Sequence, residues 1–76
     1  MNHALNVELD LIDGALVRVL GVTERRGWSA TGVLAQPCVE TRAMKLRLNV
    51  LGSRSVDLLV RQLNKLHVVR KVEVAS

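Results

Sequence analysis

Residues 5–14 read Leu-Asn-Val-Glu-Leu-Asp-Leu-Ile-Asp-Gly, and they decide how the fold begins. Apolar and polar side chains alternate from Leu5 to Leu11. This period of two is typical of a β-strand with one buried and one solvent-exposed face. Asp13 and Gly14 end this strand, and Asp13 is a favourable N-cap for a helix that follows. The chain therefore opens with a strand that passes directly into a helix.

The segment 14–26 has the apolar spacing of an amphipathic helix. Gly27 suits the left-handed position that commonly follows a helix end. Residues 28–36 then predict a weaker strand, and Pro37 is expected to break it before a loop that reaches Arg42. The apolar helix positions are Leu16, Val19, Leu20 and Thr23, and one face of the strand should carry Thr31, Val33 and Ala35.

The second half is expected to contain a strand, a helix and a last strand. Residues 44–50 alternate most regularly and predict a strand, and Ser53 or Ser55 is expected to cap a second helix. Residues 68–75 predict a last strand. The apolar stripe of the second helix is Val56, Leu59, Val60, Leu63 and Leu66.

The element order β-α-β-β-α-β predicts an α+β, ferredoxin-like fold. We expect an antiparallel sheet in the order 4-1-3-2, with both helices on one face, because two helices cannot cover both faces of so small a sheet. In that order Glu8 and Asp10 of the first strand lie between strands that carry cations, and opposite charges across strands are stabilising. Those cations are Lys45, Arg47 and Lys71.

Length and charge narrow the possible functions. The chain has 76 residues and a net charge of +4, which predicts one small domain with an excess of basic groups. With one cysteine, Cys38, an internal disulfide is impossible. We expect neither a signal peptide nor a membrane span, and we expect a cytoplasmic protein without a membrane partner. The helix cations Arg18, Arg25, Arg61 and Lys65 are interpreted as solvated.

Catalytic and metal-binding patterns are not apparent. His3 and His67 have no evident partners for general-base chemistry, and Cys38 has no histidine near it in sequence. A small RNA-binding domain of the same topology would need aromatic side chains on its central strands, and Trp28 is the only aromatic residue. We therefore expect no catalytic residue, no metal, no cofactor in this chain and no nucleic-acid partner.

Two segments go beyond these general patterns. Residues 14–22, Gly-Ala-Leu-Val-Arg-Val-Leu-Gly-Val, with Arg26-Gly27-Trp28, resemble the first βαβ unit of ACT domains in the small regulatory subunits of acetohydroxyacid synthase (acetolactate synthase). Residues 55–59 and 62–66 resemble the same subunits, above all the short isozyme II type. The resemblance implies that residues 1–76 form a single ACT domain.

The resemblance also implies a function. Such subunits have no active site, and they bind and activate a large subunit that uses thiamine diphosphate, Mg²⁺ and FAD in branched-chain amino acid synthesis. Many members sense a branched-chain amino acid held between two ACT units. Carried over by position, one wall of that effector site is Leu11, Ile12, Asp13, Gly14, Ala15 and Leu16, and the other is Trp28, Ser29, Ala30 and Thr31.

The predicted second strand forms an edge of the sheet and carries no charge between residues 28 and 36. An exposed apolar edge favours pairing with another chain, so we expect a homodimer through this edge or coverage by the large subunit. The interface residues would be Trp28, Thr31, Gly32 and Val33, although Trp28 is equally compatible with burial in the core. An alternative function is a stand-alone amino-acid-sensing ACT module with another enzyme partner.

Overall fold

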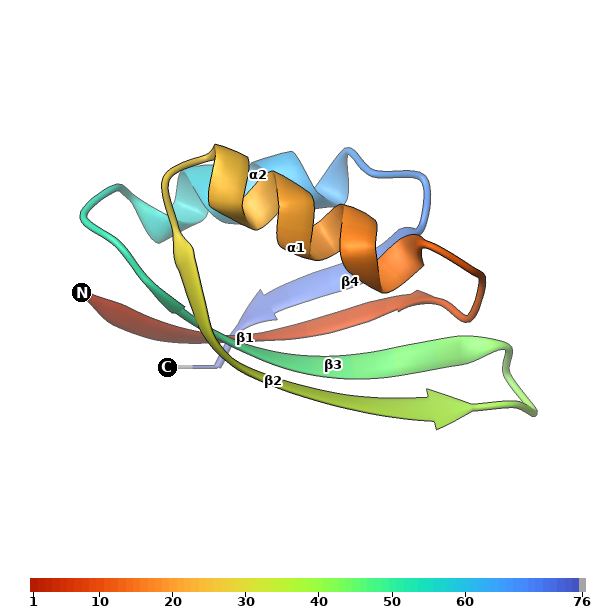
Figure 1. Cartoon of the computed structure of the whole chain (residues 1–76). Helices are drawn as coiled ribbons and strands as arrows, with labels where there is room; N and C mark the ends of the chain where they lie inside the picture. The colour runs from red at the N-terminus through yellow and green to blue at the C-terminus, as the bar shows by residue number, and fades with distance from the viewer. Residues whose placement is uncertain (76) are drawn as a thin grey trace.

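The computed structural model describes residues 1–75 and has the predicted element order (Figure 1). Four strands form one sheet, and two helices cover one of its faces. Neither helix of the described residues has the length and apolar character needed to cross a bilayer. The elements are β1 (Asn2–Asp10), α1 (Ala15–Arg25), β2 (Ser29–Cys38), β3 (Ala43–Leu51), α2 (Val56–Asn64) and β4 (Val69–Val74).

The sheet order is β2-β3-β1-β4, which is the predicted 4-1-3-2 order read from the other edge. Every neighbouring pair is antiparallel, and the predicted charge arrangement follows from the register. Glu8 lies opposite Lys45 on one side and Lys71 on the other. The first strand therefore occupies the centre of the sheet, and β2 and β4 form its two edges.

The core lies between the sheet and the helices. Alternating residues of β1 and β3 point towards the helices because successive strand side chains face opposite sides. Leu5, Leu9, Leu48, Val19 and Leu63 have no exposed surface or almost none. Thr23 is also fully buried, and its Oγ1 donates a hydrogen bond of 2.9 Å to the carbonyl oxygen of Val19 one turn earlier in α1. The single polar side chain on the predicted apolar face of α1 therefore has a hydrogen-bond partner within the helix.

Two predicted element ends were wrong. Asp13 does not cap α1: the N-cap position is held by Gly14, in the left-handed region at φ 83°. Pro37 does not end β2, which continues to Cys38, because an edge strand tolerates a residue without an N–H. Ser55, one of the two predicted residues, holds the N-cap position of α2, although its hydroxyl makes no capping hydrogen bond. Gly27 ends α1 as predicted, with φ 90°.

A bulge in β2 changes which residues face the core. The register with β3 shifts between Ala30 and Gly32, so Thr31 has no partner residue in β3. Ala30 therefore takes the helix-facing place that was predicted for Thr31. The Thr31 hydroxyl instead donates to the carbonyl oxygen of Asn49 at 3.3 Å. Bulges bend a strand locally, and this one lies near the start of β2.

Candidate functional site

The turn between β1 and α1 is open to solvent. Gly14 is exposed, and a Cβ built on it would meet no atom within 4 Å. Ile12 before it and Val17 after it are 58% and 73% exposed. Within residues 1–75, the backbone N–H groups of Leu16 and Val17 donate to no protein acceptor. The turn therefore combines free N–H donors at a helix start with exposed apolar surface.

The second predicted wall lies at the start of β2, and its residues differ in exposure. Ser29 and Thr31 are exposed, and Ala30 is half-buried. Trp28 is only 3% exposed and belongs to the core. Its indole packs edge-on against His3, with ring centroids 5.8 Å apart. Trp28 thus offers almost no surface to a ligand or to a second chain. Only a few of its atoms could contribute to the predicted effector site or to the predicted dimer interface.

These two walls lie at opposite ends of the same protomer (Figure 1). The register places Ser29 beside Leu51, which lies beside Asn2 at the start of β1. Asp10, which leads into the other wall, lies instead beside Ala43. Since β1 is a strand of nine residues, its two ends are about 27 Å apart. A single chain therefore does not bring the two predicted walls together.

The outer edge of β2 is apolar along most of its length. Val33 and Leu34 are 45% and 60% exposed, and Val39 in the following turn is 78% exposed. Leu34 and Val39 were not among the predicted site residues. For Leu34 the signal in the sequence was the absence of charge between residues 28 and 36, which located the edge without identifying its most exposed side chain. Val39 lies outside that stretch and had no such signal.

Arg70 connects three parts of the structure that meet beside the β1–α1 turn. Its Nε is 2.7 Å from Oδ1 of Asp10, and its two Nη groups donate to the carbonyl oxygens of Thr41 and Arg42 at 3.2 and 3.0 Å. The same Arg42 carbonyl accepts the N–H of Leu11 at 2.9 Å. Arg70 therefore holds the β2–β3 turn against the first predicted wall, a role that no sequence pattern had indicated.

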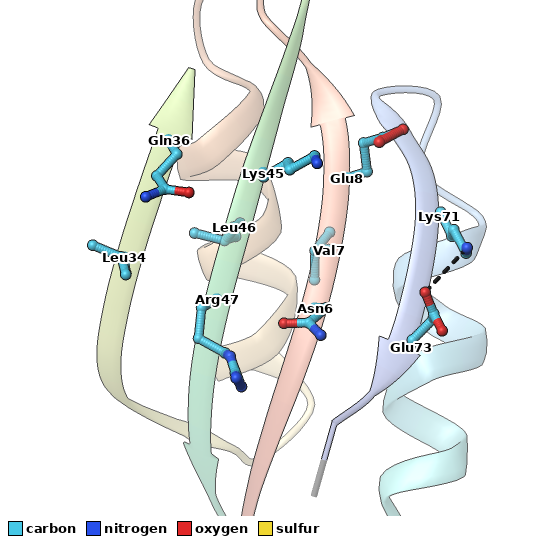
Figure 2. A pocket seen from close by; sticks show the side chains of 10 residues that line it. All are labelled: Asn6, Val7, Glu8, Leu34, Gln36, Lys45, Leu46, Arg47, Lys71 and Glu73. Atoms are coloured by element: carbon cyan, nitrogen blue, oxygen red, sulfur yellow. Dashed lines mark ion pairs between the residues drawn. The ribbon is translucent and has the colours of Figure 1, made fainter. Parts of the chain in front are cut away.

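The face of the sheet opposite the helices carries a shallow depression of about 660 Å³ (Figure 2). Lys45 and Arg47 of β3 and Glu8 of β1 point from neighbouring strands, and Lys71 pairs with Glu73 at 3.1 Å along β4. Both signs of charge are interleaved, so this face has no strong net potential. The lining residues are Asn6, Val7, Glu8, Leu34, Gln36, Lys45, Leu46, Arg47, Lys71 and Glu73.

Cys38 ends β2 and is half-buried. Hydrogen bonds from the hydroxyl and the backbone N–H of Thr41 hold the pKa of the Cys38 thiol below its ordinary value, because they stabilise the thiolate. Within residues 1–75, no group of three or more His, Cys, Asp or Glu side chains is arranged to hold a metal ion.

Comparisons with known proteins agree with this architecture. A family model described as an ACT domain matches residues 12–72. The acetolactate synthase isozyme 2 small subunit of Escherichia coli K12 is 35% identical over all 76 residues, which span 87% of its length. The acetolactate synthase small subunit of Buchnera aphidicola is 30% identical over 78 aligned residues, and this chain spans 49% of its length.

Solved structures show the same fold. The acetolactate synthase small subunit of Thermotoga maritima superposes with a TM-score of 0.84 at 20% identity, over 97% of this chain and 47% of that one. The ACT domain of the Chlorobium tepidum GTP pyrophosphokinase gives a TM-score of 0.79 at 13% identity, over 97% and 96% of the two chains. The strand order, the family model and the full-length similarity agree: this chain belongs to the ACT-domain family and, within it, to the acetolactate synthase small subunits.

Proposed function

We propose that this chain is the regulatory small subunit of an acetolactate synthase, which binds the catalytic large subunit and raises its activity. The observation that carries this function is the 35% identity to the E. coli isozyme 2 small subunit, which extends over the whole chain. Thiamine diphosphate, Mg²⁺ and FAD would belong to the large subunit, and residues 1–76 would act as a single ACT domain in the cytoplasm without an active site of their own.

Reconstitution tests this function. Purified large subunit is assayed for acetolactate formation from pyruvate while the chain is added in increasing amounts, with an unrelated ferredoxin-like domain of similar charge as the control. We expect activity to rise to a plateau at a fixed ratio of the two chains. Unchanged activity at saturating small subunit would refute the assignment and favour an ACT module with a different enzyme partner.

We further propose that two copies pair through their β2 edges. Support comes from the exposure of Val33 and Leu34 and from the absence of charge along the strand. In an antiparallel pair centred on the ten residues of β2, Ser29 of one copy would lie opposite Cys38 of the other. Cys38 lies beside Ala43, which lies beside Asp10, so Ser29–Thr31 of one copy would approach the β1–α1 turn of its neighbour.

This pairing would assemble the effector site from the two walls that a single chain keeps apart. The free N–H groups of Leu16 and Val17 suit a carboxylate, and Ile12 and Val17 suit a branched apolar side chain. We therefore propose a branched-chain amino acid as the ligand. Asp13 is exposed, and its carboxylate would have to face away from the bound carboxylate.

Amide NMR tests the effector site. Addition of valine, leucine or isoleucine should shift the backbone signals of residues 11–17 and 29–31 together, with alanine as the ligand control. The matched variant is Leu34→Lys, which adds a charge to the edge at a residue that belongs to neither wall, and it should abolish dimer formation and the shifts together. Shifts that persist in a monomeric Leu34→Lys variant would contradict the shared site.

A further inference from the structure

We propose that the groove between the end of α1 and α2 is a docking site for an acidic segment of the catalytic large subunit. This inference rests on the proposed function and adds the surface through which the two subunits recognise each other. The groove has a volume of about 370 Å³. It is lined by Val22, Arg25, Arg26, Gln62, Lys65 and Leu66.

The first support is the distribution of charge between the two layers. Residues 11–28 and 52–68, which form the helix layer, carry six Lys or Arg against three Asp or Glu, a net charge of +3. The strands and the β2–β3 turn carry five Lys or Arg against four Asp or Glu, a net charge of +1. Most of the basic excess of the protein is therefore on the helix layer.

The second support is the pairing of these charges. The two ion pairs, Asp10 with Arg70 and Lys71 with Glu73, both lie in the sheet layer. Within residues 1–75, no cation of the helix layer has a carboxylate oxygen within 4 Å, so these cations were correctly interpreted as solvated in the isolated chain. A solvated cation keeps its full charge available for a partner.

The third support is the local geometry of the groove. Arg25 and Arg26 end α1, and Lys65 follows α2, so three cations surround one depression. An Nη of Arg25 lies 3.3 Å from the place where a Cβ of Gly21 would be, so this half-buried glycine leaves room for the guanidinium along the helix. Arg54 packs over Gly27 beside them and adds a fourth positive charge.

The floor of the groove decides between an acidic protein and a nucleic acid. Val22 is buried and Leu66 is half-buried beneath the cations, and Gln62 contributes an amide. An amphipathic acidic segment would place carboxylates on the cations and an apolar side chain on Leu66. A nucleic acid would need aromatic rings for stacking, and the only ring system of this kind, Trp28, is 3% exposed. The groove therefore fits a protein segment with carboxylates.

Charge reversal on matched positions tests the groove. The groove variant is Arg25→Glu with Lys65→Glu. The control variant is Arg18→Glu with Arg61→Glu, which reverses one cation of α1 and one of α2 that do not line the groove. A neutral variant, Arg25→Gln with Lys65→Gln, covers the case in which the reversed variant does not fold. Each variant is first compared with the wild-type chain by circular dichroism and thermal unfolding.

The readout is activation of the large subunit as a function of small-subunit concentration at 50 and 300 mM NaCl. We expect the reversed groove variant to raise the half-saturating concentration about 100-fold, roughly tenfold per reversed side chain, with a plateau like that of the wild-type chain. The neutral variant should give about a tenfold rise, the control variant should stay within about threefold, and salt should weaken only the wild-type and control chains.

The outcomes separate this inference from the proposed function. A wild-type chain that fails to activate the large subunit refutes the function itself. If the wild-type chain activates and the groove and control variants shift equally, the groove is not the docking site. Normal activation by the groove variants, together with loss of binding to a 20-mer oligonucleotide, would also overturn the inference and assign the groove to nucleic acid.

Discussion

β2 and β4 are the two edges of one sheet, and they differ in how they are protected. β4 has six residues, three of them charged, and it includes the Lys71–Glu73 ion pair. β2 has ten residues without a charge, and Leu34 on it is 60% exposed. Short length and charge discourage pairing with another chain, whereas a long apolar edge favours it. The comparison teaches that β4 is protected against pairing by its shortness and its charges, whereas β2 has neither protection.

The two edges are also attached to the rest of the fold by different means. Trp28 precedes β2 and is buried in the core, in contact with Gly52. Arg70 holds β4 at the surface, where the side chains of Arg70 and Asp10 are 37% and 35% exposed. Burial of an aromatic side chain contributes several times more to stability than an exposed ion pair. We therefore expect the two attachments to respond very differently to mutation.

The largest expected effect is the loss of the Trp28 ring. Trp28→Ala should lower the free energy of unfolding by about 3–5 kcal/mol, because it removes a buried ring and leaves a cavity. Urea unfolding followed by circular dichroism measures the change. Leu34→Ala, an exposed position on the same strand, is the control and should stay within about 0.5 kcal/mol. A loss below about 1 kcal/mol for Trp28→Ala would show that β2 is not anchored by this side chain.

Gly32 within β2 and Gly52 just after β3 sharpen the same point. A Cβ on Gly52 would lie 2.6 Å from the Trp28 ring, whereas a Cβ on Gly32 would lie 2.8 Å from the mobile amide end of Asn49. Gly52→Ala should therefore cost about 1–3 kcal/mol, since the buried ring cannot move freely. Gly32→Ala should change stability by less than about 0.5 kcal/mol, because Asn49 is exposed and can rotate. Equal effects in thermal unfolding would contradict the anchoring by Trp28.

Removal of the Arg70 guanidinium should have a smaller effect. Arg70→Gln should cost about 1 kcal/mol, because three hydrogen bonds are lost at a site that is partly screened by solvent. Lys71→Gln, which breaks the more exposed pair beside it, is the matched control and should have almost no effect. Hydrogen exchange at Leu11 should also accelerate in Arg70→Gln. Unchanged exchange at Leu11 would show that Arg70 does not stabilise the β1–α1 turn.

The smallest expected effect concerns Cys38 at the end of the open edge. The pKa of its thiol should be below the ordinary cysteine value, since hydrogen bonds from Thr41 favour the thiolate. The rate of alkylation by iodoacetamide against pH measures this pKa. Thr41→Val removes the hydroxyl and should raise it, whereas Thr31→Val on the same strand should not. An identical titration in both variants would exclude the hydroxyl of Thr41 as the cause.

Periodicity and residue type predicted the element order and the end of α1 at Gly27, because these depend on patterns within short segments. The sheet order was predicted from the ferredoxin-like element order. The bulge at Thr31 was not predictable, since it arises from pairing with β3 rather than from β2 itself. β2 continues through Pro37 because β2 is an edge strand, where a residue without an N–H group is tolerated. Asp13 suited an N-cap by residue type, but the left-handed conformation of Gly14 gave that position to the glycine.

The candidate site was predictable in part. The two walls followed from a resemblance, and their separation in one chain became visible only from the register. The burial of Trp28 depends on His3 and Gly52, which are distant from it in sequence. Arg70 had no sequence signal, because its three acceptors come from three different positions that only the folded chain brings together.

Cross-linking between β2 edges tests the difference between the two edges most directly. Ser29→Cys adds a thiol to a chain whose only other cysteine, Cys38, lies at the far end of the same ten-residue strand, about 30 Å away. Oxidation should therefore yield a covalent dimer on a non-reducing gel, while Lys71→Cys, on the edge formed by β4, should remain monomeric. A Ser29→Cys chain that stays monomeric, or a Lys71→Cys chain that cross-links equally well, would contradict the account.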